Sequence, residues 1–311
     1  MTAIIFGYCG FIGVNLTKYL LNRGYTVIGV DTCCWNNGNI ENLHPFILDI
    51  REDITYEVLT AFILDKFNGQ LDEIYNLACP ASPIDYQNRP LFTLETCIAV
   101  SKICEFAKWF KAKILHASTS EVYGDALVCP QKETHNGNVN ILGLRSCYDE
   151  GKRVAETILY EYSKLGVECK IVRIFNTYGP NMKVDDGRVI PNFINQALNN
   201  EDITIYGNGK QVRSFMYIDD LLDGIFSYMN TFGSNVINLG YPEGCTIDEL
   251  ADLILELIPE SKSKKIYLEL PKDDPVLRIP DISKAKTLIN FSPKVTLREG
   301  LIKTINYYVN S

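Results

Sequence analysis

The chain has 311 residues, of which 46% are hydrophobic and 22% are charged, and its formal net charge is −8. This length allows one large domain or two smaller ones around a substantial core, and the composition is ordinary for a globular protein. Because the chain is acidic, we expect neither a nucleic-acid partner nor an anionic membrane surface as a partner.

The first predicted elements are a strand, a tight turn and a helix. The apolar run "AIIF" at 3–6 is typical of a buried strand, and "FIGVNLTKYLLNRG" at 11–24 has helical periodicity. The turn and the start of the helix carry Gly7, Gly10 and Gly13. Since the strand begins so near the first residue, no room remains for a signal peptide, and no apolar run reaches membrane-spanning length. We therefore expect a cytoplasmic protein without a membrane partner.

Strands and helices continue to alternate through the first half of the chain. Short apolar strands are predicted at 26–31, 73–78, 113–119 and 169–175, with helical stretches between them. This alternation predicts a Rossmann-type, doubly wound parallel sheet of the α/β class, with both faces covered by helices. We assign residues 1–175 to this domain and expect it to bind NAD.

The composition of the sequence and the order of its predicted elements change after Phe175. The segment that follows is rich in Gly, Pro, Asn and charge, and its helices and strands come in less regular order. We predict that 176–311 is mainly a smaller substrate-binding part at the carboxyl edge of the sheet. A segment near 215–240 returns to the larger domain, because "NVINLG" at 235–240 has the composition of a sheet strand.

The cysteines and histidines do not suggest a metal site. The ten cysteines include no C-x-x-C pair, and the three histidines do not cluster. Reduced thiols in a reducing compartment are the simplest interpretation. We predict no bound metal and no Ser-His-Asp triad.

The glycine-rich turn is suited to a pyrophosphate. Glycines let the backbone approach the phosphates closely, and the helix N-terminus offers free N–H groups and a positive dipole end. Asp31 ends the second strand, where its carboxylate could accept hydrogen bonds from both adenosine ribose hydroxyls. The same carboxylate would repel a 2′-phosphate, which favours NAD over NADP. Asp49 and Ile50 follow the next strand-like stretch and could cover the adenine.

Residues 145–153, "RSCYDEGKR", place Tyr148 four positions before Lys152. On a helix these positions share one face, so the hydroxyl and the ammonium can reach one pocket. A lone Y-x-x-x-K more often marks a surface helix with an exposed aromatic residue. As a catalytic pair, Tyr148 would remove a proton from a substrate hydroxyl, and the charge of Lys152 would help to lower its pKa from the usual value near ~10.

The segment "STSEVYG" at 118–124 follows a strand end, where open α/β sheets place their ligands. Thr119 could hydrogen-bond the reacting oxygen, and Glu121 adds a carboxylate. A polar strand end without a role is the alternative.

Together, G-x-x-G-x-x-G and Y-x-x-x-K make the chain similar to the extended short-chain dehydrogenase/reductase family over nearly its whole length. Within that family, Thr119-Ser120-Glu121 differs from the Asp-Glu pair of the 4,6-dehydratases and from the 4-epimerases, which lack the glutamate. It resembles the UDP-glucuronate decarboxylases (UDP-xylose synthases). Six further segments resemble that group in order: 78–90, 145–153, 173–180, 185–193, 205–220 and 273–286.

This resemblance implies a reaction. NAD-dependent oxidation of C4 of UDP-glucuronic acid gives a β-keto acid, which loses CO2, and reduction of the UDP-4-keto intermediate gives UDP-xylose with the cofactor recycled. The alternatives are an NAD-dependent nucleotide-sugar 4-epimerase or 4,6-dehydratase, and a catalytically silent NAD-binding regulator.

The resemblance also implies roles for residues. Tyr148 is the base and later the acid at O4, Lys152 also holds the nicotinamide ribose, Thr119 orients O4, Glu121 organises the C5–C6 region or a water, and Arg278 meets the sugar carboxylate. The expected cofactor-binding residues are Gly7, Gly10, Phe11, Ile12, Gly13, Asp31, Asp49, Ile50, Leu77, Thr96, Tyr148 and Lys152. The expected substrate-binding residues are Tyr86, Asn176, Arg188, Tyr206, Arg213 and Arg278, the arginines because they pair well with phosphate or carboxylate.

The chain departs from the pattern of this group at three places. "DTCCWNNGN" at 31–39 replaces an Asn-aromatic-aromatic-Thr-Gly run, which predicts a reshaped adenosine-ribose loop. Cys97 follows Thr96 where an asparagine is usual, and Cys79 replaces a small polar residue. Members of the group form homodimers through two long helices per subunit, one of which carries the tyrosine, so a homodimer is expected.

Overall fold

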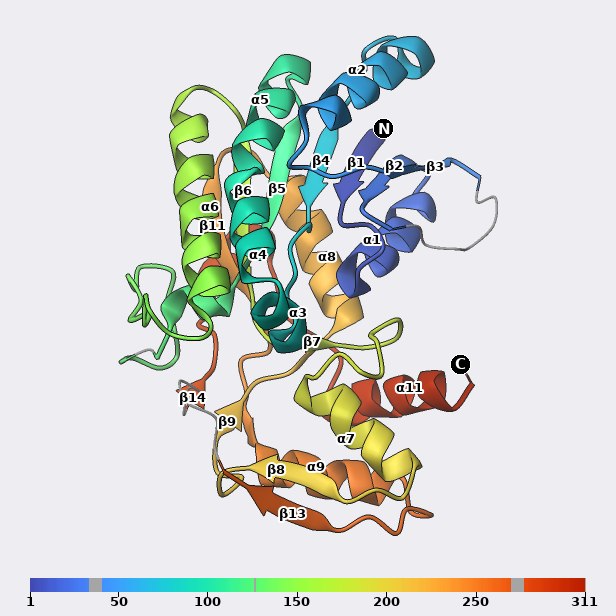
Figure 1. The fold of residues 1–311 in the computed structure, drawn as a ribbon, viewed down its shortest axis with the longest axis vertical. Helices are drawn as coiled ribbons and strands as arrows, with labels where there is room; N and C mark the ends of the chain where they lie inside the picture. The colour runs from blue at the N-terminus through green and yellow to red at the C-terminus, as the bar shows by residue number, and fades with distance from the viewer. Residues whose placement is uncertain (34–40, 126, 270–276, 311) are drawn as a thin grey trace.

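A computed structural model of the chain describes residues 1–33, 41–125, 127–269 and 277–310 (Figure 1). Its centre is a parallel seven-stranded sheet with the order β11-β6-β5-β4-β1-β2-β3. The strands are β1 (Thr2–Phe6), β2 (Thr26–Asp31), β3 (Leu43–Ile47), β4 (Glu73–Asn76), β5 (Lys113–Thr119), β6 (Cys169–Ile174) and β11 (Asn235–Leu239).

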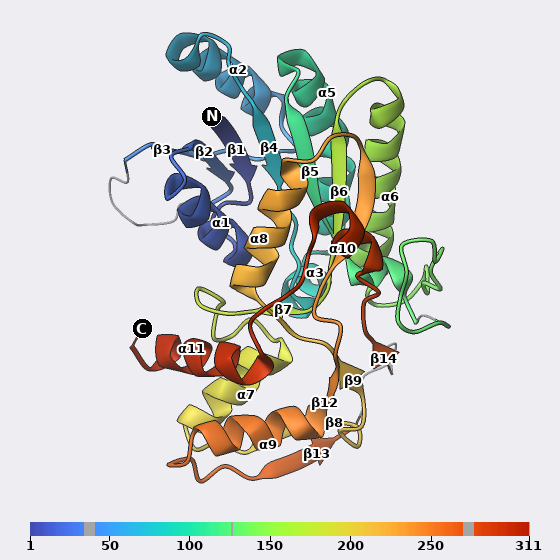
Figure 2. The same cartoon turned by 180° about the vertical axis from the view of Figure 1, so that it is seen from behind.

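Helices cover both faces of this sheet. One face carries α2 (Asp53–Phe67), α4 (Pro90–Ile98), α5 (Val100–Phe110) and α6 (Ser146–Lys164), which lie in front of the sheet in Figure 1. The opposite face carries α1 (Phe11–Leu21), α8 (Ile218–Met229) and α10 (Ser283–Ile289), which are seen in Figure 2, the view from behind. The strands are apolar on both sides because each face is buried. In β1, Ala3 and Ile5 pack into one hydrophobic cluster, and Ile4 and Phe6 pack into the other. The period of two along a strand divides the side chains between the two layers.

A smaller part lies beyond the carboxyl ends of the sheet strands. It contains α7 (Val189–Leu198), α9 (Ile247–Leu257) and α11 (Leu297–Asn310), together with β8 (Ile203–Tyr206) paired in parallel with β13 (Lys265–Leu268). Thr246 is the N-cap residue of α9, and its side chain and that of Glu249 form a reciprocal capping box.

Short strands and turns connect the two parts. The pair of β7 (Thr177–Tyr178) and β10 (Met216–Tyr217) and the three-stranded set of β12 (Cys245–Thr246), β9 (Val212–Arg213) and β14 (Leu277–Arg278) lie between them. The helix α3 (Pro83–Asn88) and the 3-10 turn η1 (Ser120–Tyr123) follow β4 and β5 at the same edge.

The predicted fold class is confirmed: a Rossmann-type parallel sheet carries a smaller C-terminal part. The strand β11 pairs with β6 at the edge of the sheet, although it follows part of the smaller region in sequence. The boundaries assigned to the two domains stay a prediction. Within the described ranges, no helix combines the length and apolar character needed to cross a bilayer.

Candidate active site

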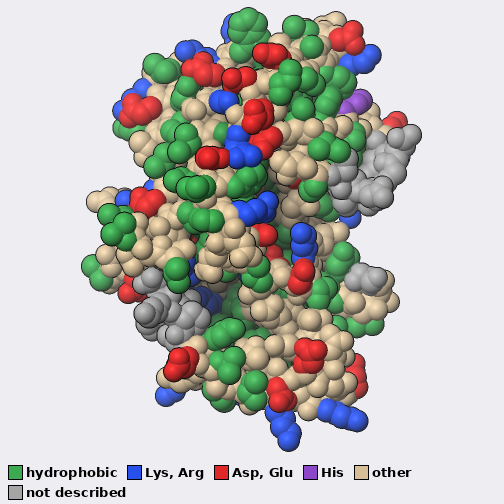
Figure 3. Space-filling view, in the orientation of Figure 1, with side chains coloured by type: hydrophobic (Ala, Val, Ile, Leu, Met, Phe, Trp, Pro, Cys, Tyr) green, Lys and Arg blue, Asp and Glu red, His purple; other side chains and the backbone are tan. Residues whose placement is uncertain are grey.

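A cavity of about 1040 Å³ lies between the carboxyl edge of the sheet and the smaller part. Figure 3 shows the molecule hollowed between these two regions, with Lys and Arg side chains near the hollow. Every residue that the sequence nominates for the cofactor, the substrate or catalysis lines this cavity: Gly7, Gly10, Phe11, Ile12, Gly13, Asp31, Asp49, Ile50, Leu77, Tyr86, Thr96, Thr119, Glu121, Tyr148, Lys152, Asn176, Arg188, Tyr206, Arg213 and Arg278. The structure thus brings the nominated residues together, and their individual roles stay predictions.

The turn between β1 and α1 is shaped to accept an anion. Gly7 has φ +85, a backbone conformation that favours glycine, and a Cβ at Gly13 would lie 2.1 Å from the carbonyl oxygen of Gly7. Gly10 is the N-cap of α1 and has no side chain of its own to cover the N-terminus of the helix. The first turn of α1 therefore presents backbone N–H groups to the cavity, as a dinucleotide pyrophosphate requires.

Asp31 is fixed at the end of β2. Its Oδ2 accepts a hydrogen bond of 3.0 Å from the backbone N–H of Cys9, and its Oδ1 accepts one of 2.8 Å from that of Thr32. These bonds hold the carboxylate beside the glycine-rich turn. A carboxylate oxygen has about two lone-pair positions, so Oδ2 can still accept from a ribose hydroxyl.

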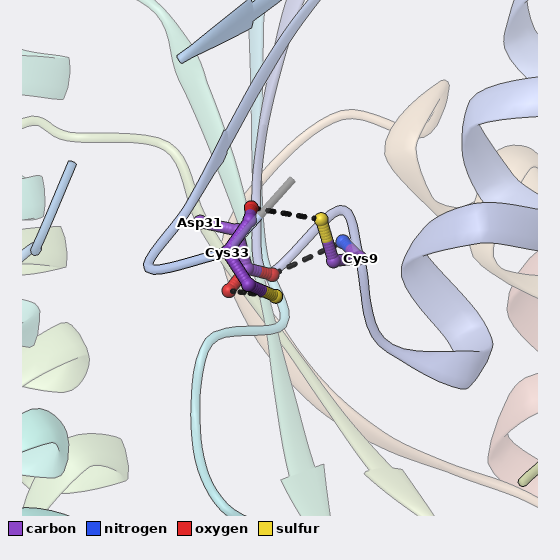
Figure 4. A group of neighbouring side chains, drawn as sticks. All are labelled: Cys9, Asp31 and Cys33. Carbon is purple, nitrogen blue, oxygen red and sulfur yellow. Dashed lines mark hydrogen bonds between the residues drawn. The ribbon is translucent and has the colours of Figure 1, made fainter. Parts of the chain in front are cut away.

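Asp31 also belongs to a group of possible metal ligands. Among the residues that the structure describes, Cys9, Asp31 and Cys33 place one ligand atom each within 4.8 Å of the others (Figure 4). The Cys33 thiol donates to Asp31 Oδ1 over 3.6 Å, and the Cys9 thiol donates to the carbonyl of Cys33 over 3.1 Å. Burial, followed by the nearby Asp31, raises the pKa of Cys9 to about 12 and also raises that of Cys33. Protonated thiols that donate hydrogen bonds account for this group without a metal.

Asp49 is held by a bidentate ion pair. Arg51 approaches both Asp49 oxygens, the shortest N···O distance being 2.8 Å. Burial opposes ionisation, but the hydrogen bonds and charge of Arg51 keep the pKa of Asp49 below its usual value. The neighbouring Ile50 is 5% exposed. Asp49 is therefore a fixed anion at the cavity wall, with Ile50 as an apolar surface beside it.

The helix α6 places Tyr148 and Lys152 on its buried face. The Lys152 ammonium donates a 2.7 Å hydrogen bond to the carbonyl of Ala117 at the end of β5, and its Nζ lies 5.9 Å from the centre of the Tyr148 ring. Tyr86 stacks on Tyr148, with ring centres 5.0 Å apart and an angle of 8° between the ring planes. The nominated tyrosine is thus packed inside the cavity and is not on an exposed helix face.

Burial raises the pKa of Tyr148 above its ordinary value, and the nearby Cys79 raises it further. A side-chain hydrogen bond with Thr119 and the charge of Arg188 act in the opposite direction. Thr119 also caps the η1 turn, where its hydroxyl oxygen accepts from the N–H of Glu121 over 3.2 Å. Thr119 therefore links the tyrosine hydroxyl to the turn that carries Glu121.

Glu121 lies between two arginines. Its Oε1 pairs with Arg278 and its Oε2 pairs with Arg145. Burial alone would raise the pKa of Glu121, but the charges of Arg278 and Arg145 outweigh it and hold the pKa at about 2. Arg278 is 2% exposed and also donates to the carbonyl of Gly124 over 3.0 Å. The three side chains form a buried ionic cluster at the cavity wall.

Sequence reasoning missed Arg145 and Asp149. Arg145 precedes Tyr148 by three positions at the start of α6, and this spacing was a usable signal for a shared helix face. Asp149 is 7% exposed, and its Oδ1 has no hydrogen-bond partner among the residues that the structure describes. Burial, followed by the charge of Glu121, raises the pKa of Asp149 to about 7. No local sequence pattern identifies an aspartate whose pKa will be raised in this way, because the shift depends partly on Glu121, which lies in the turn after β5.

The residues nominated for the nucleotide line the same cavity. Arg188 Nη2 donates to the carbonyl of Ala81 over 2.8 Å, and Arg213 is 8% exposed and close enough to Glu121 to help lower its pKa. Asn176 lies between β6 and β7, and Tyr206 is 48% exposed at the end of β8. Two cations, an amide and an aromatic ring thus contribute to the lining of this cavity.

Two of the three departures from the family pattern meet in space. The sulfur atoms of Cys79 and Cys97 lie 3.6 Å apart, beside α6. Of the altered segment 31–39, positions 34–39 lie outside the described residues, and Asp31, Thr32 and Cys33 line the cavity. The prediction of a reshaped ribose loop therefore rests on residues that are mostly not described.

Comparisons with known proteins agree with this geometry. Residues 3–240 match the NAD dependent epimerase/dehydratase family. The chain is 46% identical over 309 residues to UDP-glucuronic acid decarboxylase 3 of Arabidopsis thaliana, covering 97% of this chain and 87% of that protein. It is 45% identical over 307 residues to UDP-glucuronic acid decarboxylase 1 of Danio rerio, covering 98% and 72% of the two chains.

A solved structure of a related enzyme has the same fold. UDP-glucuronic acid 4-epimerase from Bacillus cereus, in complex with UDP-glucuronic acid and NAD, superposes with a TM-score of 0.86 at 27% identity, over 100% of this chain and 99% of that chain. The chain belongs to the NAD dependent epimerase/dehydratase family, and within it to the group of the UDP-glucuronic acid decarboxylases.

Proposed function

We propose that this protein is an NAD-dependent decarboxylase that converts UDP-glucuronic acid to UDP-xylose. The observation that most directly supports this activity is the cluster of Glu121, Arg278 and Arg145 beside Tyr148. A tyrosine–lysine pair suits oxidation of a sugar hydroxyl, and an adjacent group of arginines suits a sugar that bears a carboxylate. The relatives at 44–46% identity that are named UDP-glucuronic acid decarboxylases support the same assignment.

The residues present fit NAD. The glycine-rich turn and the N-terminus of α1 would hold the pyrophosphate, Asp31 the adenosine ribose, and Asp49 and Ile50 the adenine. Lys152 would hold the nicotinamide ribose, with Leu77 and Thr96 along the same wall. Bound NAD would supply a hydride acceptor for C4 of the sugar and, later in the cycle, the hydride donor.

Tyr148 moves the proton at O4. Its hydroxyl is linked to Thr119, so both side chains can face one substrate oxygen. The ammonium of Lys152 opposes the burial that disfavours a tyrosinate, although its main hydrogen bond is to Ala117. When C4 becomes a ketone, the same tyrosine holds the proton that is returned to O4 at the end.

The ionic cluster governs the loss of CO2. Arg278 is 2% exposed in this wall, where its guanidinium can meet the carboxylate of the sugar. Because Arg278 is already paired with Glu121, it can hold the sugar carboxylate without over-stabilising the group that must leave. The electrons left behind are delocalised onto the C4 oxygen, and C5 is then protonated.

The nucleotide is assigned to the wall formed by the smaller part. Arg188 and Arg213 would bind the diphosphate or the uridine ribose, Asn176 would donate to the diphosphate, and Tyr206 would contact the uracil. Tyr86, stacked on Tyr148, would reach the sugar.

We also propose a homodimer formed through α4 and α6. These two helices pack side by side, and their outer faces carry exposed apolar side chains: Leu91 and Ile98 on α4, and Val154 and Tyr160 on α6. Several exposed apolar side chains on two neighbouring helices are a feature of protein interfaces. Sedimentation of the wild type and of Val154→Glu tests this, and a monomeric wild type would contradict it.

We also propose that the protein is located in the cytosol. The nine cysteines in the described part of the chain are free thiols, and five of them are only partly buried: Cys9, Cys79, Cys129, Cys147 and Cys245. Free thiols are typical of a reducing compartment. Fractionation of the source cells tests this assignment.

The reaction is tested by incubating the protein with NAD and UDP-glucuronic acid and following the sugar nucleotide by NMR. We expect UDP-xylose without net NADH. Accumulation of a UDP-4-keto-pentose together with NADH would show that the return of hydride is defective. Formation of UDP-galacturonic acid without CO2 would move the protein to the epimerases and overturn the proposal.

A further inference from the structure

Cys79 and Cys97 form a thiol pair at the wall of the active site. Cys79 lies in the loop between β4 and α3, and Cys97 lies near the end of α4. Their sulfur atoms are 3.6 Å apart, so one thiol donates to the other. Cys79 lines the cavity, whereas Cys97 is 1% exposed behind it. One sulfur of the pair can therefore be reached by a small molecule that enters the cavity, and the other is protected.

The pair is packed against the catalytic helix. A Cβ on Gly151 would lie 3.0 Å from the Cys97 sulfur, so Cys97 touches α6 between the positions of Tyr148 and Lys152. The hydrogen bond from Cys79, followed by the charge of Lys152, lowers the pKa of Cys97 against the effect of burial. The same hydrogen bond and burial raise the pKa of Cys79. The positive charge of Lys152 acts on both thiols in the direction that favours a thiolate, the form that oxidation needs.

We propose that Cys79 and Cys97 are a redox modification site, at which a hydroperoxide forms a reversible disulfide that switches the enzyme off. The sulfur of Cys79, which lines the cavity, attacks one oxygen of hydrogen peroxide; the O–O bond breaks, the other oxygen leaves as water with the thiol hydrogen, and Cys79 becomes a sulfenic acid. The second thiol attacks the sulfenic sulfur, forming the S–S bond and releasing another water. Both thiol hydrogens leave in the two water molecules, and the peroxide is the two-electron oxidant. A dithiol such as dithiothreitol restores both cysteines by exchange.

The disulfide would disturb the substrate side of the cavity. Closing the sulfur separation from 3.6 Å to the bonded length of about 2.05 Å draws the loop at Cys79 towards α4. The same loop supplies the Ala81 carbonyl that accepts from Arg188, and Ser82, which caps α3. Tyr86 on α3 stacks on Tyr148. A shift of the loop is therefore transmitted to one nucleotide-binding arginine and to the aromatic stack over the catalytic tyrosine.

The test is peroxide treatment followed by mass mapping of the disulfide and by an activity measurement. We expect a cross-linked peptide pair containing Cys79 and Cys97, with loss of about tenfold or more in decarboxylation rate that dithiothreitol reverses. Cys97→Ala, at a side chain outside the cavity, should keep its basal rate and lose the reversible inactivation. Cys104→Ala, at a buried cysteine on α5, should respond like the wild type.

A second readout does not depend on turnover. Saturating NAD with UDP should slow the cross-link by covering Cys79, which lines the cavity. If Cys97→Ala folds poorly, Cys97→Ser and the mapping of the wild type decide the matter. A cross-link between Cys79 and Cys147 instead, no cross-link at all, or equal inactivation of wild type and Cys97→Ala would overturn the proposal. Because the cross-link is mapped directly, its outcome is separate from that of the proposed reaction.

Discussion

Glu121 and Arg278, 157 positions apart in sequence, form an ion pair in the active-site wall, in which Arg278 is 2% exposed. The carboxylate comes from the turn after β5, and the guanidinium comes from the short strand β14 of the smaller part. Because the pair joins the catalytic edge of the sheet to the substrate-binding part, both its charge and its position bear on the reaction.

Replacement of Glu121 by Gln should lower the rate of decarboxylation about a hundredfold or more while leaving NAD affinity nearly unchanged. The amide keeps the shape but removes the charge that Glu121 sets against Arg278, so the sugar carboxylate is held too strongly to leave. CO2 release and calorimetric NAD titration measure the two effects.

The matched control is Glu156→Gln. Glu156 also forms a buried ion pair, with Arg173 at 2.7 Å, but it does not line the cavity. This variant should lose stability and keep its rate per folded molecule. An unchanged rate in Glu121→Gln would contradict the role assigned to that carboxylate.

Replacement of Tyr148 by Phe should lower the rate by about a thousandfold, because it removes the hydroxyl that is assigned to take the O4 proton. The ring and its stack on Tyr86 remain, so the cavity keeps its shape. Steady-state kinetics with UDP-glucuronic acid measure the change. Tyr160→Phe, at a tyrosine of the same helix that is 59% exposed, serves as the control and should be silent. Full activity in Tyr148→Phe would favour a silent NAD-binding regulator.

Replacement of Asp31 by Asn should weaken NAD binding by about tenfold, or about 1.4 kcal/mol, and reduce the preference over NADP. The variant keeps a hydrogen-bonding group at the end of β2 but loses the charge that repels a 2′-phosphate. Fluorescence titration with both cofactors gives the ratio. Asp53→Asn, on the exposed start of α2, should leave both affinities as they are. A NAD to NADP ratio that Asp31→Asn does not alter would exclude this role.

Asp149 should make the protein less stable as the pH rises. Its pKa is about 7 in the native state and is raised from the model-peptide value of 3.8. Between about pH 4 and pH 7 the native state keeps the proton that the unfolded state has lost, so the free energy of unfolding falls with increasing pH. Asp149→Asn should remove this slope and be the more stable protein above pH 7, by roughly 1–4 kcal/mol.

Urea unfolding at several pH values measures the slope. Asp65→Asn, at an aspartate with 71% exposed side chain, is the control and should follow the wild type. Parallel curves for the wild type and Asp149→Asn would show that Asp149 titrates normally.

The regular elements of the larger domain follow from local sequence. The apolar runs predict β2 and β5 with their observed bounds, because strands buried on both faces need continuous apolar residues. The two-residue strands β9 and β14 have no such signal, since two residues cannot show a period. They form only because the smaller part brings distant segments together.

The residues of the site, like the strands, could be predicted where their signal is local and not where it depends on distant segments. Motif spacing was sufficient to nominate Tyr148, Lys152 and the glycine-rich turn, because each is contained within one turn or helix. The arginine partners of Glu121, and the contact between Cys79 and Cys97, join elements whose relative positions no local pattern encodes. The raised pKa of Asp149 has the same origin, since it arises from burial and from Glu121.

The most direct test of the account uses UDP-glucuronic acid with deuterium at C4, converted in ordinary water with the wild type and NAD. The account predicts one CO2 per product, UDP-xylose that retains deuterium at C4 and carries a new solvent hydrogen at C5, and no net NADH. Loss of the C4 deuterium to solvent, or a six-carbon product that keeps its carboxylate, would contradict oxidation at C4 followed by decarboxylation at this site.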